Sequence, residues 1–175
     1  MIKIVARLQV IYVNFMIWLV GRLLEAASKV DKRIQEEIVA LPTAFAFSMR
    51  VLPSGPEFTV QKQPDGTLYC KRKNDKIPAE LTISFKHVKH AFLVLSFQES
   101  TARSFANDRM LLDGEIDLGM VVVRCLDRME SLVLPKFIAM RAVKRYPSIS
   151  LSKKLTLAVK IYVQVLAGLF RRGHV

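Results

Sequence analysis

The sequence predicts an α+β domain with a two-layer architecture: a five-stranded, mainly antiparallel sheet with helices on one face. Segments in which apolar and polar residues alternate, such as 81–86, predict strands. Segments with apolar residues three and four positions apart predict helices, and apolar, basic helices lie at both ends of the chain. We expect a helical segment over 1–40, a sheet domain over 41–147 and a terminal apolar helix over 148–175.

The first predicted element is an apolar helix over residues 4–24, interrupted by Arg7, Asn14 and Arg22. Its longest apolar stretch, 8–20, rises about 20 Å, which is less than the ~30 Å of bilayer hydrocarbon. A membrane-spanning helix is therefore not predicted here.

A cleaved signal peptide is an alternative for this segment. Lys3 and Arg7 precede the apolar run, and the small residues 26–28 follow it, as at a cleavage site. Asn14 within the run and Glu25 next to the small residues argue against cleavage. The remaining interpretations are a helix that packs on its own domain and a helix that contacts a membrane surface.

The sequence of the first half of the sheet domain predicts four strands in a meander. A charged helix over 28–40, with Val30, Ile34 and Ile38 facing inward, precedes them. The hairpin signal Pro64-Asp65-Gly66 separates the second strand from the third. The four strands are expected over 45–51, 58–62, 67–72 and 81–85.

After the fourth strand the period changes and predicts helices around a fifth strand. A helix begins at His87, and a short helix capped by Ser100 or Thr101 follows it. Asp113-Gly114 is a turn, and a long helix begins near Asp117, whose carboxylate suits a helix N-terminus. The expected inward side chains are Val88, Ala91, Phe92 and Leu95 of the first helix, Ala102, Phe105 and Ala106 of the second, Met110 and Leu112 of the strand, and Leu118, Val121, Val122, Cys125 and Met129 of the long helix.

The net charge of +12 lies at the two ends of the chain. Residues 1–24 hold three basic and no acidic side chains, and nine basic and no acidic ones follow Glu130. The last predicted helix, 151–170, is apolar on most sides, which favours contact with lipid or protein. Each basic residue near an anionic bilayer contributes ~1 kcal/mol. The expected membrane contacts are Lys153, Lys154, Lys160, Arg171 and Arg172.

The order of elements and the segment 104–118, SFANDRMLLDGEIDL, resemble the sterol carrier protein type-2 family. The family's glycine before the arginine is Asp108 here, its Gly-Asp pair is Gly114-Glu115, and its small-residue turn is Ser96-Phe97. The resemblance covers roughly residues 42–137. It implies an apolar tunnel between sheet and helices for a fatty acyl, isoprenoid or sterol-like ligand, closed by a C-terminal helix.

The residues that point toward this interface would serve equally as ordinary core, and only the resemblance assigns some of them to a ligand. The candidate lipid contacts are Phe45, Phe47, Ile83, Phe85, Phe92, Phe105, Met110, Leu112, Val122 and Leu166.

Catalytic and cofactor motifs are not found in the sequence, so no catalytic residue, cofactor or metal is predicted. His87 and His90 share a helix turn, but Lys86 and Lys89 beside them would repel a cation. Cys70 and Cys125 have no metal-ligand spacing and are expected to be buried thiols.

We therefore expect a non-enzymatic, cytoplasmic protein, peripheral to a membrane, that binds a lipid and exchanges it at an anionic membrane surface. The alternative is a structural or interaction protein whose terminal helices form a homodimer or present a lipid precursor to a membrane-bound enzyme complex. Nucleic-acid binding rests only on a pI near 10.0 and is not expected, because no recognition motif accompanies the charge.

Overall fold

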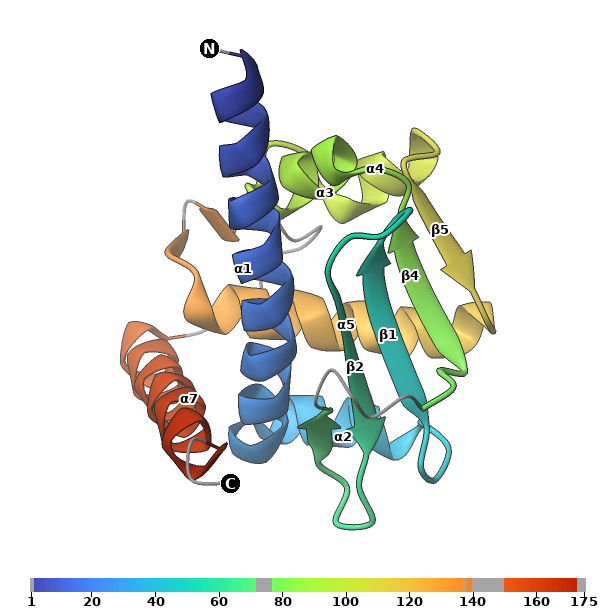
Figure 1. Cartoon of the computed structure of the whole chain (residues 1–175). Helices are drawn as coiled ribbons and strands as arrows, with labels where there is room; N and C mark the ends of the chain where they lie inside the picture. The colour runs from blue at the N-terminus through green and yellow to red at the C-terminus, as the bar shows by residue number, and fades with distance from the viewer. Residues whose placement is uncertain (1, 72–76, 137, 140–149, 173–175) are drawn as a thin grey trace.

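The computed structural model describes residues 2–71, 77–136, 138–139 and 150–172, which form one five-stranded sheet with helices packed on one face (Figure 1). The predicted α+β class is confirmed. The elements are α1 (Ile2–Val30), α2 (Lys32–Val39), β1 (Ala46–Val51), β2 (Glu57–Lys62), β3 (Leu68–Cys70), β4 (Leu81–Phe85), α3 (Val88–Leu95), α4 (Thr101–Ala106), β5 (Met110–Asp113), α5 (Ile116–Val133) and α7 (Leu151–Arg172).

The sheet is mixed, with strand order β3-β2-β1-β4-β5. The first three strands form the expected meander, but β4 pairs with the other side of β1 in parallel, with Phe47 opposite Leu81. The predicted four-stranded meander and the mainly antiparallel description are therefore wrong in this detail. The reason is burial: every residue of β4 is buried, which suits a central strand rather than an edge.

The two faces of the sheet differ in chemistry, as a one-faced sheet requires. Phe47, Met49 and Ile83 are buried on the face that the helices cover. The opposite face carries polar side chains that bond to one another. For example, Arg50 Nε donates to Ser84 Oγ at 2.9 Å. The alternation of apolar and polar residues along the strands therefore correctly predicted which face of the sheet the helices cover.

The second half of α1 is part of the hydrophobic core. Ile17, Leu24 and Ala27 are fully buried. At Gly21 the helix lies so close to the sheet that an added Cβ would sit 2.9 Å from Cγ of Phe58 and 3.0 Å from Sγ of Cys70. The helix of segment 1–40 thus packs directly on the sheet.

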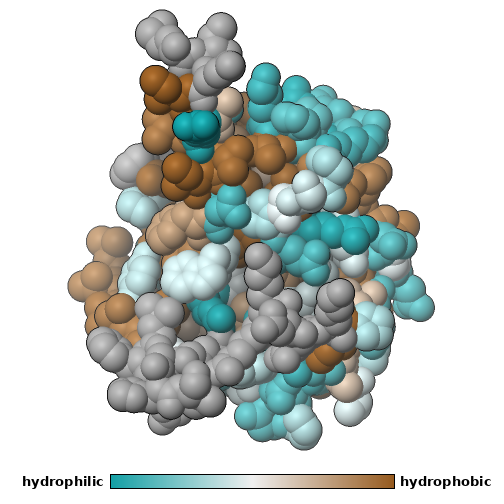
Figure 2. All heavy atoms as spheres, viewed as in Figure 1, coloured by the Kyte–Doolittle hydropathy of each residue, from teal (hydrophilic) through white to brown (hydrophobic). Residues whose placement is uncertain are grey.

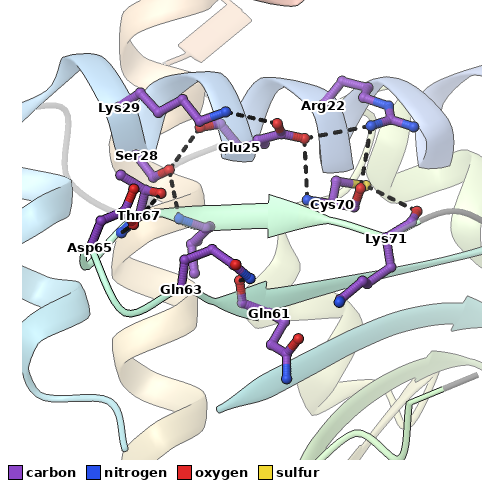
Figure 3. Close-up of polar contacts among 11 residues, drawn as sticks. Arg22, Glu25, Ser28, Lys29, Gln61, Gln63, Asp65, Thr67, Cys70 and Lys71 are labelled. Carbon is purple, nitrogen blue, oxygen red and sulfur yellow. Dashed lines mark hydrogen bonds and ion pairs between the residues drawn. The ribbon is translucent and has the colours of Figure 1, made fainter. Parts of the chain in front are cut away.

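Side chains of α1 also cover the outer edge of β3 (Figure 3). The N–H groups of Leu68 and Cys70 point away from β2, and they donate to Ser28 Oγ at 3.0 Å and Glu25 Oε2 at 3.2 Å. An Arg22 guanidinium nitrogen donates to the Cys70 carbonyl at 3.4 Å. An edge strand that would otherwise offer free backbone groups is therefore closed by a helix.

Helix α5 packs across the covered face and is held to the start of α2. Val121, Val122 and Met129 are buried, as expected. Asp31 caps α2 by accepting from the Ile34 N–H at 3.1 Å, and the same carboxylate accepts from Arg128 at 2.9 Å. This buried pair fixes the angle between the two helices.

Helix α4 corrects one sequence prediction. Ser100 caps it as expected, but Ser104 faces the interior, whereas Ala102 and Ala106 are exposed and Phe105 is 48% exposed. The Arg109 N–H donates to the Ser104 carbonyl at 3.0 Å, which fixes the end of this short helix over β5 with the Ser104 side inward. A helix of six residues is too short for periodicity to define its buried face.

Candidate functional site

The first candidate site is a small cavity where α1, α5 and the sheet meet. Its volume is about 10 Å³, roughly what one water molecule needs. Long apolar ligands occupy pockets of several hundred Å³. Its lining consists of Leu24, Leu41, Phe45, Phe47, Val60, Leu68, Val122 and Cys125.

The tunnel expected between the sheet and the helices stays a prediction, because the cavity that the described residues form at this junction is much smaller than a lipid ligand. The rings of Phe45 and Phe47 and the side chain of Leu24 on α1 fill the space between the layers. Phe47 and Phe58 also stack edge to face with ring centres 5.8 Å apart. A ligand would have to separate α1 or α5 from the sheet.

Three of the ten predicted lipid contacts line the cavity, namely Phe45, Phe47 and Val122. Another five belong to the surrounding core: Ile83, Phe85 and Met110 are buried, and Phe92 and Leu112 are half-buried. The remaining two are exposed, Phe105 by 48% and Leu166 by 55%. The inward orientation expected for Phe105 is therefore wrong, and contact of either side chain with lipid stays a prediction.

Sequence reasoning missed five of the lining residues. Val60 and Leu68 follow from alternation along β2 and β3, and this signal was present in the sequence. Leu24 was missed because the N-terminal helix was treated separately from the sheet domain.

The second candidate site is an exposed apolar stripe on the first half of α1. Ile4, Leu8, Ile11, Phe15 and Trp18 are 38–64% exposed. Their spacing of four and three residues places them on one side of the helix. The first turns of α1 project beyond the sheet and the other helices (Figure 1). Beside this stripe, Tyr12 OH donates to the Leu95 carbonyl at 3.0 Å, so α3 supports the projecting half.

Helix α7 carries a second stripe. Its outward residues are Leu151, Leu155, Val159, Tyr162, Val163 and Leu166, which are 46–79% exposed. On its inner side Ile161 is fully buried. Lys154 Nζ donates to the Leu134 carbonyl at 2.6 Å, and Tyr162 OH donates to the Val133 carbonyl at 3.3 Å. A narrow apolar inner face and a few hydrogen bonds thus hold α7 on the rest of the domain.

The two stripes account for most of the exposed apolar surface. Of the seventeen large apolar side chains exposed among the described residues, five belong to the α1 stripe and six to the α7 stripe. The two helices pack against each other, and Figure 2 shows apolar side chains along the upper part of α1 and on the outer side of α7. We call these two stripes together the apolar surface.

Positive charge borders the apolar surface. Lys153 and Lys160 are exposed, and α7 contains no acidic residue. Lys154 is half-buried and bonded to Leu134, so it is not a free contact. The side chains of Arg171 and Arg172, also predicted as membrane contacts, lie outside the described part.

By length and composition alone, α1 is long and apolar enough over Ala6–Val30 to cross a membrane. Half of that stretch is buried within the domain, as in the core helix of a folded protein.

The titratable groups indicate structural roles. Burial raises the pKa of the Cys70 thiol to about 11 and that of Cys125 to about 12, so both behave as apolar side chains. His87 caps α3 by accepting from the Lys89 N–H at 3.1 Å. Within the described ranges, no three His, Cys, Asp or Glu side chains gather as a metal site requires.

The pKa of Glu130 is raised to about 8. The larger cause is burial of its carboxyl group, and the smaller one is the negative charge of the nearby Asp127.

No protein-family model and no curated protein matches the chain. Among solved structures, it is similar to the sterol carrier protein domain 2 of Helicoverpa armigera, with 15% identity, a TM-score of 0.46 and coverage of 66% of this chain and 89% of that chain. It is also similar to Sterol Carrier Protein 2 Like 2 from Aedes aegypti, with 8% identity, a TM-score of 0.33 and coverage of 57% and 94%. At these TM-scores, neither structure assigns a family or a ligand to this chain.

Proposed function

We propose that the protein is a non-enzymatic lipid-binding or lipid-transfer protein that works at an anionic membrane surface. One observation carries the proposal: two neighbouring helices, α1 and α7, turn continuous apolar stripes outward instead of toward the core. Soluble proteins rarely leave such surface without a partner. The absence of acidic residues from both stripes favours a partner with negative charge.

The energetics favour a bilayer as that partner. Burying one large apolar side chain completely stabilises by ~1.5–3 kcal/mol, so a half-exposed one contributes roughly 1 kcal/mol when lipid covers it. Five such residues on the α1 stripe and six on the α7 stripe, with ~1 kcal/mol from each nearby lysine, give an attraction of several kcal/mol after entropic costs. Trp18 and Tyr162, at the borders of the stripes, are side chains that favour the interface between headgroup and hydrocarbon.

The proposed ligand site is the junction between α1, α5 and the sheet, lined by Phe45, Phe47 and Val122. Because the cavity there is small, a fatty acyl, isoprenoid or sterol-like molecule enters only when helices separate. Deeper insertion of α7, in which lipid also covers its inner side at Ile161, competes with the narrow contact of this helix to α1 and α5. The membrane thereby shifts the population toward an open state.

Membrane binding can be tested with the chain's single tryptophan. Trp18 lies at the border of the α1 stripe, so its emission should shift to the blue when vesicles containing phosphatidylglycerol are added, and less with phosphatidylcholine alone. Flotation with the same vesicles provides a second readout. Leu155→Glu and Ile11→Glu should each reduce flotation by about tenfold or more, since each places a charge in the lipid-facing stripe.

Val39→Glu is the matched control for these variants. Val39 is 77% exposed and apolar but lies on α2, outside the apolar surface, so this change should leave flotation unaltered. Equal loss in all three variants, or flotation that ignores lipid charge, would argue against the proposed surface.

Ligand binding needs a separate measurement. Native mass spectrometry of the purified protein should show an adduct of lipid mass, or uptake of an added fluorescent fatty acid. Val122→Ile should reduce that uptake without changing flotation, because one added methyl group narrows the small cavity with little strain on the core. A clean apo mass and no uptake with vesicles present would contradict the lipid-carrier part and leave the membrane part standing.

The second candidate function is presentation or assembly through protein contacts. It is favoured by the strict four-three spacing of Ile4, Leu8, Ile11 and Phe15, which matches the seam of a two-helix coiled coil. Sedimentation with and without detergent separates the two, because a dimer that survives detergent and does not float with vesicles favours this alternative.

A further inference from the structure

The two edge strands of the sheet, β3 and β5, differ in whether their outward backbone groups are hydrogen-bonded. On β3, Ser28, Glu25 and Arg22 of α1 bond to the outward backbone groups. On β5, the opposite edge, no hydrogen bond from any residue that the structure describes reaches the outward groups. An edge strand with free N–H and C=O groups is a template for another strand.

The register of β5 identifies which groups are free. Ser84 is opposite Leu111 and Thr82 is opposite Asp113 in the antiparallel pair with β4, and the Lys86 N–H donates to the Arg109 carbonyl. In this alternating pattern residues 109, 111 and 113 bond inward to β4. The backbone groups of Met110 and Leu112 therefore point outward.

The segment Arg109-Met110-Leu111-Leu112-Asp113 is complementary to itself when reversed. In an antiparallel pair centred on Leu111, Met110 of one copy is opposite Leu112 of the other, so the outward groups meet and exchange hydrogen bonds. Arg109 is then opposite Asp113 at both ends. Opposite charges across a strand pair are favourable, and a two-fold axis repeats each contact.

The side chains at these positions are accessible. Leu111 is 42% exposed and Asp113 is exposed, both on the polar face of the sheet. One Arg109 guanidinium nitrogen donates to Glu99 at 2.8 Å, and its remaining N–H groups have no partner among the described residues. A second carboxylate can therefore bind beside Glu99.

We propose that β5 pairs with β5 of a second copy of this chain, antiparallel about Leu111, and joins two five-stranded sheets into one. The contact is independent of lipid binding and leaves α1 and α7 free. A pair of such short strands buries less area than stable complexes do, so the dimer is weak and depends on concentration.

Cross-linking tests the register directly. Cys70 and Cys125 are buried, so Leu111→Cys would create a single accessible thiol on the axis. Directly opposite residues in the pair without mutual hydrogen bonds lie close enough for a disulfide, with Cα atoms ~4.5 Å apart. Mild oxidation should convert most of this variant to a covalent dimer. Met120→Cys, at a position on α5 that is 51% exposed but off the axis, should remain largely monomeric.

Sedimentation velocity over a hundredfold concentration range provides the solution test. The wild-type average mass should rise with concentration. Leu111→Glu and Asp113→Arg, which place like charges opposite each other, should each weaken the association at least tenfold, whereas Met120→Glu should not. Thermal melts confirm that the variants fold.

Three outcomes would overturn the proposal: a wild-type chain that stays monomeric throughout, equal cross-linking of both cysteine variants, or an association that neither Leu111→Glu nor Asp113→Arg weakens. The last would assign association to another surface.

Discussion

Replacing Gly21 by alanine separates two opposing physical effects. Gly21 lies in the middle of α1, where alanine favours the helix by about 0.5–1 kcal/mol over glycine. The added Cβ would approach Cγ of Phe58 to 2.9 Å and Sγ of Cys70 to 3.0 Å. Both partners are buried, and the Phe58 ring is held by its edge-to-face contact with Phe47.

The packing effect should be the larger one. Extra atoms in a well-packed core typically cost ~1–3 kcal/mol, because neighbours must leave their preferred positions. After the gain in helix propensity, Gly21→Ala should lower the free energy of unfolding by roughly 1–2 kcal/mol. A larger side chain, as in Gly21→Leu, should separate α1 from β2 and β3 altogether.

Gly168→Ala in α7 is the matched control, because no described atom outside the neighbouring helix backbone lies within 4 Å of its added Cβ. Urea unfolding followed by far-ultraviolet circular dichroism should show Gly168→Ala unchanged or up to ~1 kcal/mol more stable. If Gly21→Ala is as stable as the wild type, α1 does not pack on the sheet in solution. That result would also remove the basis for assigning the first helix to the folded domain.

Three further predictions follow from buried polar and titratable groups. Asp31→Ala removes both the α2 cap and the partner of Arg128, whose buried guanidinium is left uncompensated, so unfolding in urea should require roughly 3–5 kcal/mol less. The pKa of Cys70, raised to about 11, and that of Cys125, raised to about 12, predict that a thiol reagent at pH 8 labels neither in the folded chain and both in denaturant; rapid labelling of the folded chain would contradict the burial. The pKa of Glu130 is raised from 4.5 to about 8, so the folded chain holds this proton more tightly; its effect should lower stability as pH rises from about 4.5 to about 8, and Glu130→Gln should flatten that slope in denaturation curves measured at several pH values.

The sequence predicted element types well because each signal is local. The alternation in 45–51 and the cap at Ser100 depend on neighbours within a few positions, and the structure has them as expected. Strand order is not local. The parallel pairing of Phe47 with Leu81 depends on which strands are most buried. A prediction that pairs only consecutive strands cannot detect it.

The candidate site was predicted less well than the fold, for two reasons. Parity along a strand identifies inward side chains such as Phe45 and Phe47, but it cannot distinguish a filled interior from a tunnel. Leu166 was assigned to the interior because the terminal helix was expected to act as a lid, whereas this side chain faces outward on α7. An amphipathic pattern says that a helix has an apolar side, and tertiary contacts decide whether the protein covers it.

The contacts of α1 limit how this helix can engage a membrane. Moving it into a bilayer as a spanning helix would remove Ser28 and Glu25 from the N–H groups of Leu68 and Cys70. Two buried donors without partners cost ~1–3 kcal/mol each, and the β3 edge would open to aggregation. The first half of the helix does not hold the β3 edge in this way, and its outward side from Ile4 to Trp18 is exposed. Engagement by the projecting half alone keeps the sheet closed, so the expected mode is insertion along the surface with the second half of α1 still holding β3.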